Sequence, residues 1–149
     1  MISHLSSELK QQMLTDMENL YHDLSEELSL LPAPCTSCGF CCHFDAAKHF
    51  LYVSTLEMVY LFDKYELNLH VKNREVCPFL SKNMCSVRDR RMLGCRTYFR
   101  LHNKQQTIAS EEIYEQYLTK IKELHKKYSV QWEYQDCMNI FQERSKDLN

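Results

Sequence analysis

The chain has 149 residues, of which 44% are hydrophobic. One domain of this size buries most of its unfolded surface, so it does not need a metal merely to be compact, as a zinc finger does. The sequence pI of about 6.4 argues against nucleic-acid binding, and no apolar run reaches the roughly 20 residues of a membrane span. The N-terminal residues lack the basic start and apolar stretch of a secretion signal, so we expect a cytoplasmic protein with reduced thiols.

An amphipathic helix is predicted at the N-terminus, because apolar residues recur at steps of three and four from residue 2 to residue 31. Pro32 and Pro34 would end this helix. After the first cysteines, the apolar stretch Phe50–Val53 predicts a short strand.

The middle of the chain predicts two short helices. The sequence Ser54-Thr-Leu-Glu57 is a capping box, which opens a helix that continues to about Tyr65. Residues 68–84 are expected to be irregular. We then expect Ser86 to cap a two-turn helix that reaches Leu93, with Gly94 in the position after its end.

The C-terminal part predicts a long amphipathic helix from about Ser110, a strand in the alternating Val130–Tyr134 segment, and a last helix over 136–144. The sequence therefore predicts a mainly α protein. Its long N- and C-terminal amphipathic helices would pack around an irregular, cysteine-rich metal-binding centre with little β structure. We expect a single domain over 1–149, which comprises an N-terminal helix (1–31), a cysteine-cluster core (34–99) and a C-terminal helical extension (101–149).

Seven of the eight cysteines are crowded into 61 residues in the middle of the chain. These seven are Cys35, Cys38, Cys41, Cys42, Cys77, Cys85 and Cys95. Both glycines and all three prolines lie within three residues of a cysteine, where they set the turns that ligand loops require. Thiolates at two-residue spacing suit a soft metal. A disulfide scaffold is the poorer interpretation, because cytosolic thiols stay reduced and adjacent cysteines fit a disulfide framework badly.

The spacing does not separate zinc from an iron–sulfur cluster. Zinc sites use Cys-x2-Cys repeatedly, whereas three close cysteines with a remote Cys-Pro also fit a four-iron cluster. We predict a primary site of four cysteines, with the other three within a few ångströms of it. The four are Cys35, Cys38, Cys41 and Cys77, and the three are Cys42, Cys85 and Cys95. These three would be neighbouring or exchangeable thiols, or else sulfurs would bridge two metals.

Other ligand-type residues carry weaker signals. His43 and His49 lie close to the cysteines and could supply nitrogen ligands, but an isolated histidine such as either of these, or His102, is more often a surface or core residue. Cys137 falls on a predicted helix far along the chain, and we interpret it as a small buried core residue.

The charges are unevenly distributed. Residues 1–31 carry six acids and one lysine, whereas residues 72–104 carry nine lysines and arginines and two acids. The basic segment could be a solvated face, could face the acidic N-terminal helix, or could neutralise the metal site, and we favour a mixture of the last two. A metal with four thiolates has a net charge of about −2, which a nearby arginine stabilises. We therefore predict that Arg91 and Arg96 support the cofactor.

The order and spacing of these motifs resemble the YkgJ-like cysteine-cluster family. The resemblance covers Pro34 to Phe99 and includes all seven clustered cysteines, as well as Arg91 and Arg96. Met92 stands where that family usually has proline, and Arg88 where an aromatic residue is usual. The family is described as a putative zinc- or iron-chelating domain. A similar module in flagellin lysine methylases implies an iron–sulfur cluster, but this chain is too short for such a multidomain enzyme.

The first functional hypothesis is a metal-binding protein that holds an iron–sulfur cluster or zinc, with a redox, sensing or metal-handling role. The second is an enzyme, or an accessory module of an enzyme, that uses the metal site; the sequence leaves this open, although it shows no Ser/His/Asp set, phosphate loop or paired carboxylates. The third is a structural zinc module that binds a protein partner through the basic segment.

Overall fold

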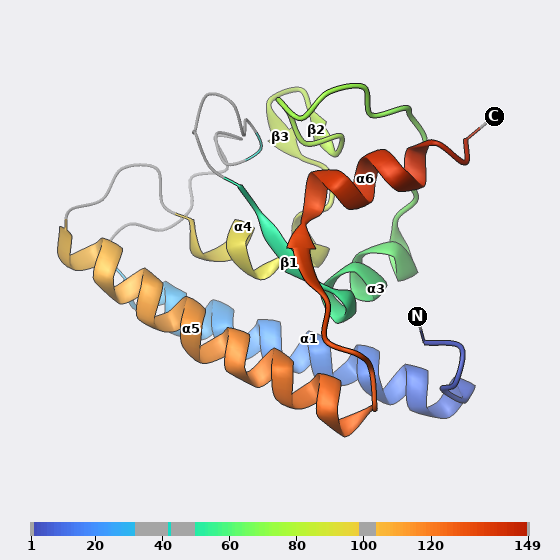
Figure 1. Ribbon diagram of the computed structural model, residues 1–149. Helices are drawn as coiled ribbons and strands as arrows, with labels where there is room; N and C mark the ends of the chain where they lie inside the picture. The colour runs from blue at the N-terminus through green and yellow to red at the C-terminus, as the bar shows by residue number, and fades with distance from the viewer. Residues whose placement is uncertain (1, 32–41, 43–49, 99–103, 149) are drawn as a thin grey trace.

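The computed structural model describes residues 2–31, 42, 50–98 and 104–148. Within these ranges, helices dominate and the strands form two small two-stranded sheets, so the mainly α class predicted from the sequence is confirmed (Figure 1). None of the helices seen there has both the length and the apolar character that a membrane span needs.

The N-terminal helix α1 spans Ser7–Ser29. It begins later than predicted because Ser6 caps it: the Ser6 hydroxyl accepts the Leu9 amide at 3.2 Å. The residues before Ser6 form a turn in which the Leu5 amide donates to the Ile2 carbonyl. Most of the predicted apolar face is buried, whereas Leu9, which belongs to the same stripe, is exposed. The buried residues are Met13, Leu14, Met17, Leu20, Tyr21 and Leu24.

The longest helix, α5, spans Lys104–Lys127 and lies antiparallel beside α1 (Figure 1). It begins six residues before the predicted start. At its C-terminal end, the Asp16 carboxylate of α1 accepts hydrogen bonds from the Lys127 ammonium group at 2.8 Å and the Tyr128 hydroxyl at 2.5 Å. Around this pair lies the first core, whose buried members come mainly from α1, α3 and α5 and include no described cysteine.

The predicted capping box is confirmed. Helix α3 spans Thr55–Lys64, and the Ser54 amide donates to Glu57 Oε2 at 2.7 Å while the Glu57 amide donates to the Ser54 hydroxyl at 3.4 Å. Strand β1 (Tyr52–Ser54) leads directly into this helix. The predicted strand is therefore present, but it begins two residues later and ends one residue later than expected.

Strand β4 (Tyr134–Asp136) pairs antiparallel with β1, so that Tyr52 faces Asp136 and Ser54 faces Tyr134. Only the end of the predicted Val130–Tyr134 strand is in the ladder. The last helix α6 spans Cys137–Ser145, close to the prediction, and Asp136 caps it by accepting the Met138 amide at 3.1 Å.

The predicted helix from Ser86 to Leu93 is wrong. The segment instead contains a short hairpin, β2 (Leu80–Ser81) and β3 (Met84–Cys85), then a single 3-10 turn, η2 (Arg88–Arg90), and a short helix, α4 (Leu93–Thr97). The two hairpin-turn residues have positive φ angles, 51° at Lys82 and 62° at Asn83, which match the twist of a tight hairpin. The Ser86 hydroxyl caps no helix, since it donates to the Phe79 carbonyl at 2.5 Å.

Gly94 lies inside α4 and does not follow the end of a helix. A Cβ atom at this position would lie 2.2 Å from Leu51 Cδ1, so the absence of a side chain allows α4 to approach the segment before β1. Leu51 also accepts the Cys137 amide through its carbonyl at 2.8 Å, which joins α6 to the same place.

A second core lies beside the helix pair and contains all five described cysteines. Its aromatic centre contains Phe62 of α3, Phe79, which follows Cys77 and Pro78, and Phe141 of α6. The ring of Phe141 packs edge to face against Phe62 at 6.2 Å and against Phe79 at 5.5 Å between ring centres. The fold thus separates an ordinary helical core from a core that is rich in cysteine.

Candidate metal centre

Four of the seven predicted metal ligands are described, and the structure brings them to one core from four segments. They are Cys42, Cys77, Cys85 and Cys95. The Cys77 amide donates to the Cys42 carbonyl at 2.7 Å, which joins the end of the first cysteine run to the Cys-Pro motif. Cys85 lies on β3 and pairs with Leu80, while Cys95 lies on α4. Cys42 and Cys77 are buried, and the other two are half-buried.

The surroundings of Cys85 favour the thiolate form of its side chain. Its pKa is lowered to about 6, because the Cys42 thiol donates a hydrogen bond to it, the Val87 amide donates another, and the charges of Arg91 and Arg88 lie nearby; burial opposes this shift. A low thiol pKa keeps the sulfur in the form that a metal binds. Two neighbouring arginines therefore favour the thiolate form of a motif cysteine.

Cys137 joins the motif cysteines although it lies 42 residues after Cys95. It is fully buried at the start of α6, which agrees with its interpretation as a core residue. Burial raises its pKa well above the usual value, and the thiols of Cys95 and Cys77 raise it further. The position of this cysteine next to the motif cysteines could not be found from sequence spacing.

Arg96 is buried, with 8% of its surface exposed, and its guanidinium holds the backbone before α4. It donates to the Arg91 carbonyl at 2.8 Å and to the Asp89 carbonyl at 2.9 Å. It also lies 3.9 Å from the centre of the Tyr21 ring of α1, so part of the basic segment does face the N-terminal helix. The role of Arg96 toward a bound metal stays a prediction.

Arg91 is half-buried, and its Nε donates to the Arg88 carbonyl at 3.0 Å. Met92, which stands where the resemblance leads one to expect proline, has a φ of −71°. This is the value that a proline ring fixes, so the methionine preserves the backbone course into α4.

The three remaining predicted ligands, Cys35, Cys38 and Cys41, lie outside the described residues. The histidines that carried only a weak signal, His43, His49 and His102, lie outside them too. Within the ranges that the structure does describe, no three cysteine, histidine, aspartate or glutamate side chains are grouped so that they could hold a metal ion. No disulfide joins any two of the five described cysteines.

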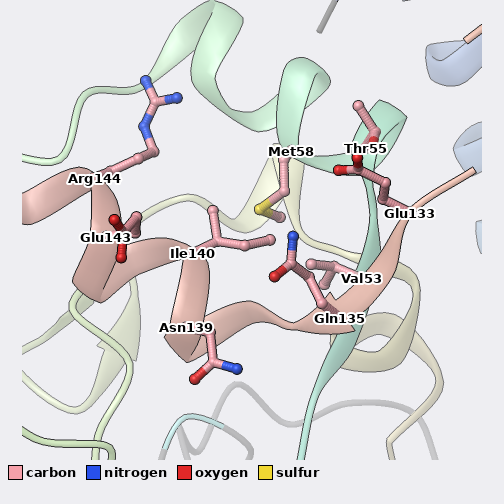
Figure 2. A pocket seen from close by; sticks show the side chains of 9 residues that line it. All are labelled: Val53, Thr55, Met58, Glu133, Gln135, Asn139, Ile140, Glu143 and Arg144. Carbon is pink, nitrogen blue, oxygen red and sulfur yellow. The ribbon is translucent and has the colours of Figure 1, made fainter. Parts of the chain in front are cut away.

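A pocket of about 370 Å³ lies elsewhere, between β1, α3, β4 and α6. Figure 2 shows Met58, Ile140 and Gln135 directed into the same space, with Glu133 and Glu143 at its two sides. Its lining includes none of the cysteines that the structure describes, so the pocket is separate from the described part of the candidate metal centre.

Comparison of the chain with protein-family models, with curated proteins and with solved structures finds no match.

Proposed function

We propose that this protein binds a metal through its clustered cysteine thiolates and holds either an iron–sulfur cluster or zinc. The ligands would come from Cys35, Cys38, Cys41, Cys42, Cys77, Cys85 and Cys95. The resemblance to the YkgJ-like cysteine-cluster family is part of this proposal, as is a cytoplasmic location, where reducing conditions keep the thiols available.

One observation carries the proposal: motif cysteines from four separate segments meet in a single core. The hydrogen bond between the Cys77 amide and the Cys42 carbonyl is the clearest contact, because it connects two motifs that are 35 residues apart. Cys42 is also the last residue of the CxxCxxCC run, so the backbone leads from this contact to the three cysteines before it. A helical core that binds no metal does not require cysteines from four separate segments of the chain.

The surrounding charges suit thiolate ligation. A four-thiolate site carries a net charge of about −2, and an arginine near it contributes favourably in a partly buried environment. Arg91 and Arg88 already lower the pKa of Cys85. A redox, sensing or metal-handling role would follow from an iron–sulfur cluster, whose reduction potential rises with nearby positive charge.

A structural zinc site is the second candidate, and the burial of Cys42 and Cys77 favours it. Structural zinc sites are closed by four protein ligands, whereas catalytic sites keep one position open. In this case the bound metal would stabilise the second core, and the basic segment would be available to a protein partner.

Anaerobic purification followed by analysis of iron, acid-labile sulfide and zinc tests the proposal. Iron with sulfide and a brown colour would identify a cluster, and zinc alone would identify a zinc site. The variants Cys77→Ala and Cys95→Ala should lose most of the metal, whereas Cys137→Ala serves as the matched control outside the motif. A wild-type protein that holds neither metal after reconstitution would refute the proposal.

A further inference from the structure

Three donors from separate parts of the chain converge on the carboxylate of Glu57, which has 1% of its surface exposed. The Ser54 amide donates to Oε2 at 2.7 Å, and the Leu93 amide donates to Oε1 at 2.8 Å. The Tyr21 hydroxyl also donates to Oε1, at 3.3 Å. The capping box of α3 requires only the first of these bonds.

The bond to Leu93 reaches the first residue of α4. Amides in the first turn of a helix have no partner within the helix and need an external acceptor. At five residues, α4 is also too short to be stable without tertiary contacts. Glu57 supplies the external acceptor from inside the protein, and the motif residue Cys95 follows two positions later.

Tyr21 connects the same carboxylate to the other end of this segment. Its hydroxyl bonds to Glu57, while its ring lies 3.9 Å from the Arg96 guanidinium. Arg96 in turn holds the carbonyls of Asp89 and Arg91. The Leu93 amide, before Cys95, thus bonds directly to Glu57 of α3. Arg96, after Cys95, is connected to Glu57 through the side chain of Tyr21.

We propose that Glu57 is a positioning residue for Cys95: by accepting the Leu93 amide it fixes the start of α4 and hence the place of this thiol in the cysteine cluster. The role in metal binding rests on the proposed thiolate centre, whereas the positioning of the thiol does not. Groups that orient metal ligands from outside the coordination sphere typically change metal affinity by about 10- to 100-fold.

Two variants separate this role from helix capping. Glu57→Gln keeps a capping-box residue for Ser54, because glutamine is accepted at this position. However, its carboxamide has only one acceptor oxygen, so an NH2 group replaces the acceptor of either the Ser54 or the Leu93 amide. Ser54→Ala is the matched control, since it removes the capping hydroxyl of the same helix and leaves the Glu57–Leu93 bond intact.

The first measurement uses metal-free protein and needs no ligand. Alkylation of Cys95 by iodoacetamide, quantified by mass spectrometry against Cys77 in the same sample, should be about tenfold faster in Glu57→Gln, because the lost hydrogen bond involves a buried acceptor. The ratio should stay near the wild-type value in Ser54→Ala. Tyr21→Phe, which removes one bond and keeps the ring, should change the ratio in the same direction by less.

The second measurement uses cobalt(II) as the probe. Glu57→Gln should bind cobalt at least about tenfold more weakly than wild type and shift the thiolate-to-cobalt absorption, while Ser54→Ala should preserve the spectrum. If wild type binds no cobalt but Glu57→Gln still exposes Cys95, the metal-binding proposal fails and the positioning role stands. If Glu57→Gln and Ser54→Ala behave alike in both measurements, Glu57 is only a helix cap and the inference is overturned. If Glu57→Gln does not fold, an unchanged ratio of Cys95 to Cys77 alkylation in Tyr21→Phe would also overturn the inference.

Discussion

The Cys77 amide donates to the Cys42 carbonyl at 2.7 Å, although 35 residues separate the two. Pro78 follows Cys77, and proline favours an extended conformation in the residue before it. This preference favours a backbone contact between Cys77 and Cys42, and such a contact does not use the Cys77 thiol. Both cysteines are buried, so the contact is made within the second core.

The lowered pKa of Cys85 predicts selective alkylation. In metal-free protein at pH 7, Cys85 should be largely thiolate, because its pKa is about 6. Cys137, whose pKa burial raises well above its usual value, should react far more slowly. Iodoacetamide labelling over a pH series, followed by peptide mass spectrometry, measures both.

The cause of the low Cys85 pKa can be tested by replacing Cys42, whose thiol donates a hydrogen bond to Cys85. Cys42→Ala removes the hydrogen-bond donor and should move the midpoint of Cys85 labelling to higher pH, whereas Cys42→Ser keeps a donor and should move it less. Arg91→Gln should also raise the midpoint, since it removes a nearby positive charge. Equal midpoints in all these proteins would contradict the assignment.

Removal of the metal should affect the two cores differently. A structural thiolate site contributes on the order of 10 kcal/mol, but the first core contains no described cysteine and depends on the 23 residues of α1 and the 24 of α5. Chelation should therefore disorder the cysteine-rich part while most of the far-UV circular dichroism of the helices survives. Hydrogen exchange should show loss of protection in the second core and retention in α1 and α5. Complete loss of helical signal would mean that the first core also depends on the metal.

Local signals were sufficient for several elements. The capping box at Ser54 and Glu57 lies within four residues, and the structure has both of its hydrogen bonds. The apolar stripe of α1 was equally visible, because a period near 3.6 residues needs no knowledge of the partner helix. The crowding of seven cysteines into 61 residues is visible in the sequence, whereas their arrangement as one metal centre stays a prediction.

Contacts between distant residues account for what the sequence could not predict. Gly94 looked like the residue after a helix end, but its absent side chain is explained by Leu51, 43 residues earlier. Glu57 looked like an ordinary capping residue, because nothing in the local sequence indicates that Leu93 meets its second oxygen. Cys137 joins the motif cysteines only because the pairing of β1 with β4 brings the start of α6 to Leu51.

His125 predicts a loss of stability in acid. Its Nε2 accepts the Leu56 amide at 3.4 Å, so the proton lies on Nδ1, which donates to the Val130 carbonyl at 3.3 Å. Burial lowers the pKa of this histidine below the ordinary 6.5. A lowered pKa means that the neutral ring stabilises the fold fully above pH 6.5, and that this stability is lost as the pH falls through the lower, folded-state pKa.

Chemical denaturation at pH 7.5 and pH 5 should therefore show a smaller pH dependence in His125→Gln than in wild type. The difference should be on the order of 1 kcal/mol, the net value of one buried hydrogen bond. His22→Gln is the control substitution of a histidine, because His22 is exposed on α1. A His125→Gln protein with the full wild-type pH dependence would show that another group is responsible.

The close contact between Gly94 and Leu51 predicts an unusual sign for a glycine substitution in a helix. Replacing glycine by alanine within a helix ordinarily stabilises it by up to about 1 kcal/mol. Here the added Cβ would lie 2.2 Å from Leu51 Cδ1, and Leu51 is buried. Overpacking of this kind costs about 1–3 kcal/mol, so Gly94→Ala should destabilise the protein. Leu51→Ala removes the obstructing methyl groups, and in that background Gly94→Ala should be neutral or stabilising. A double-mutant cycle in the free energy of unfolding measures this reversal, and a stabilising effect of Gly94→Ala in the wild-type background would show that Leu51 can move aside freely.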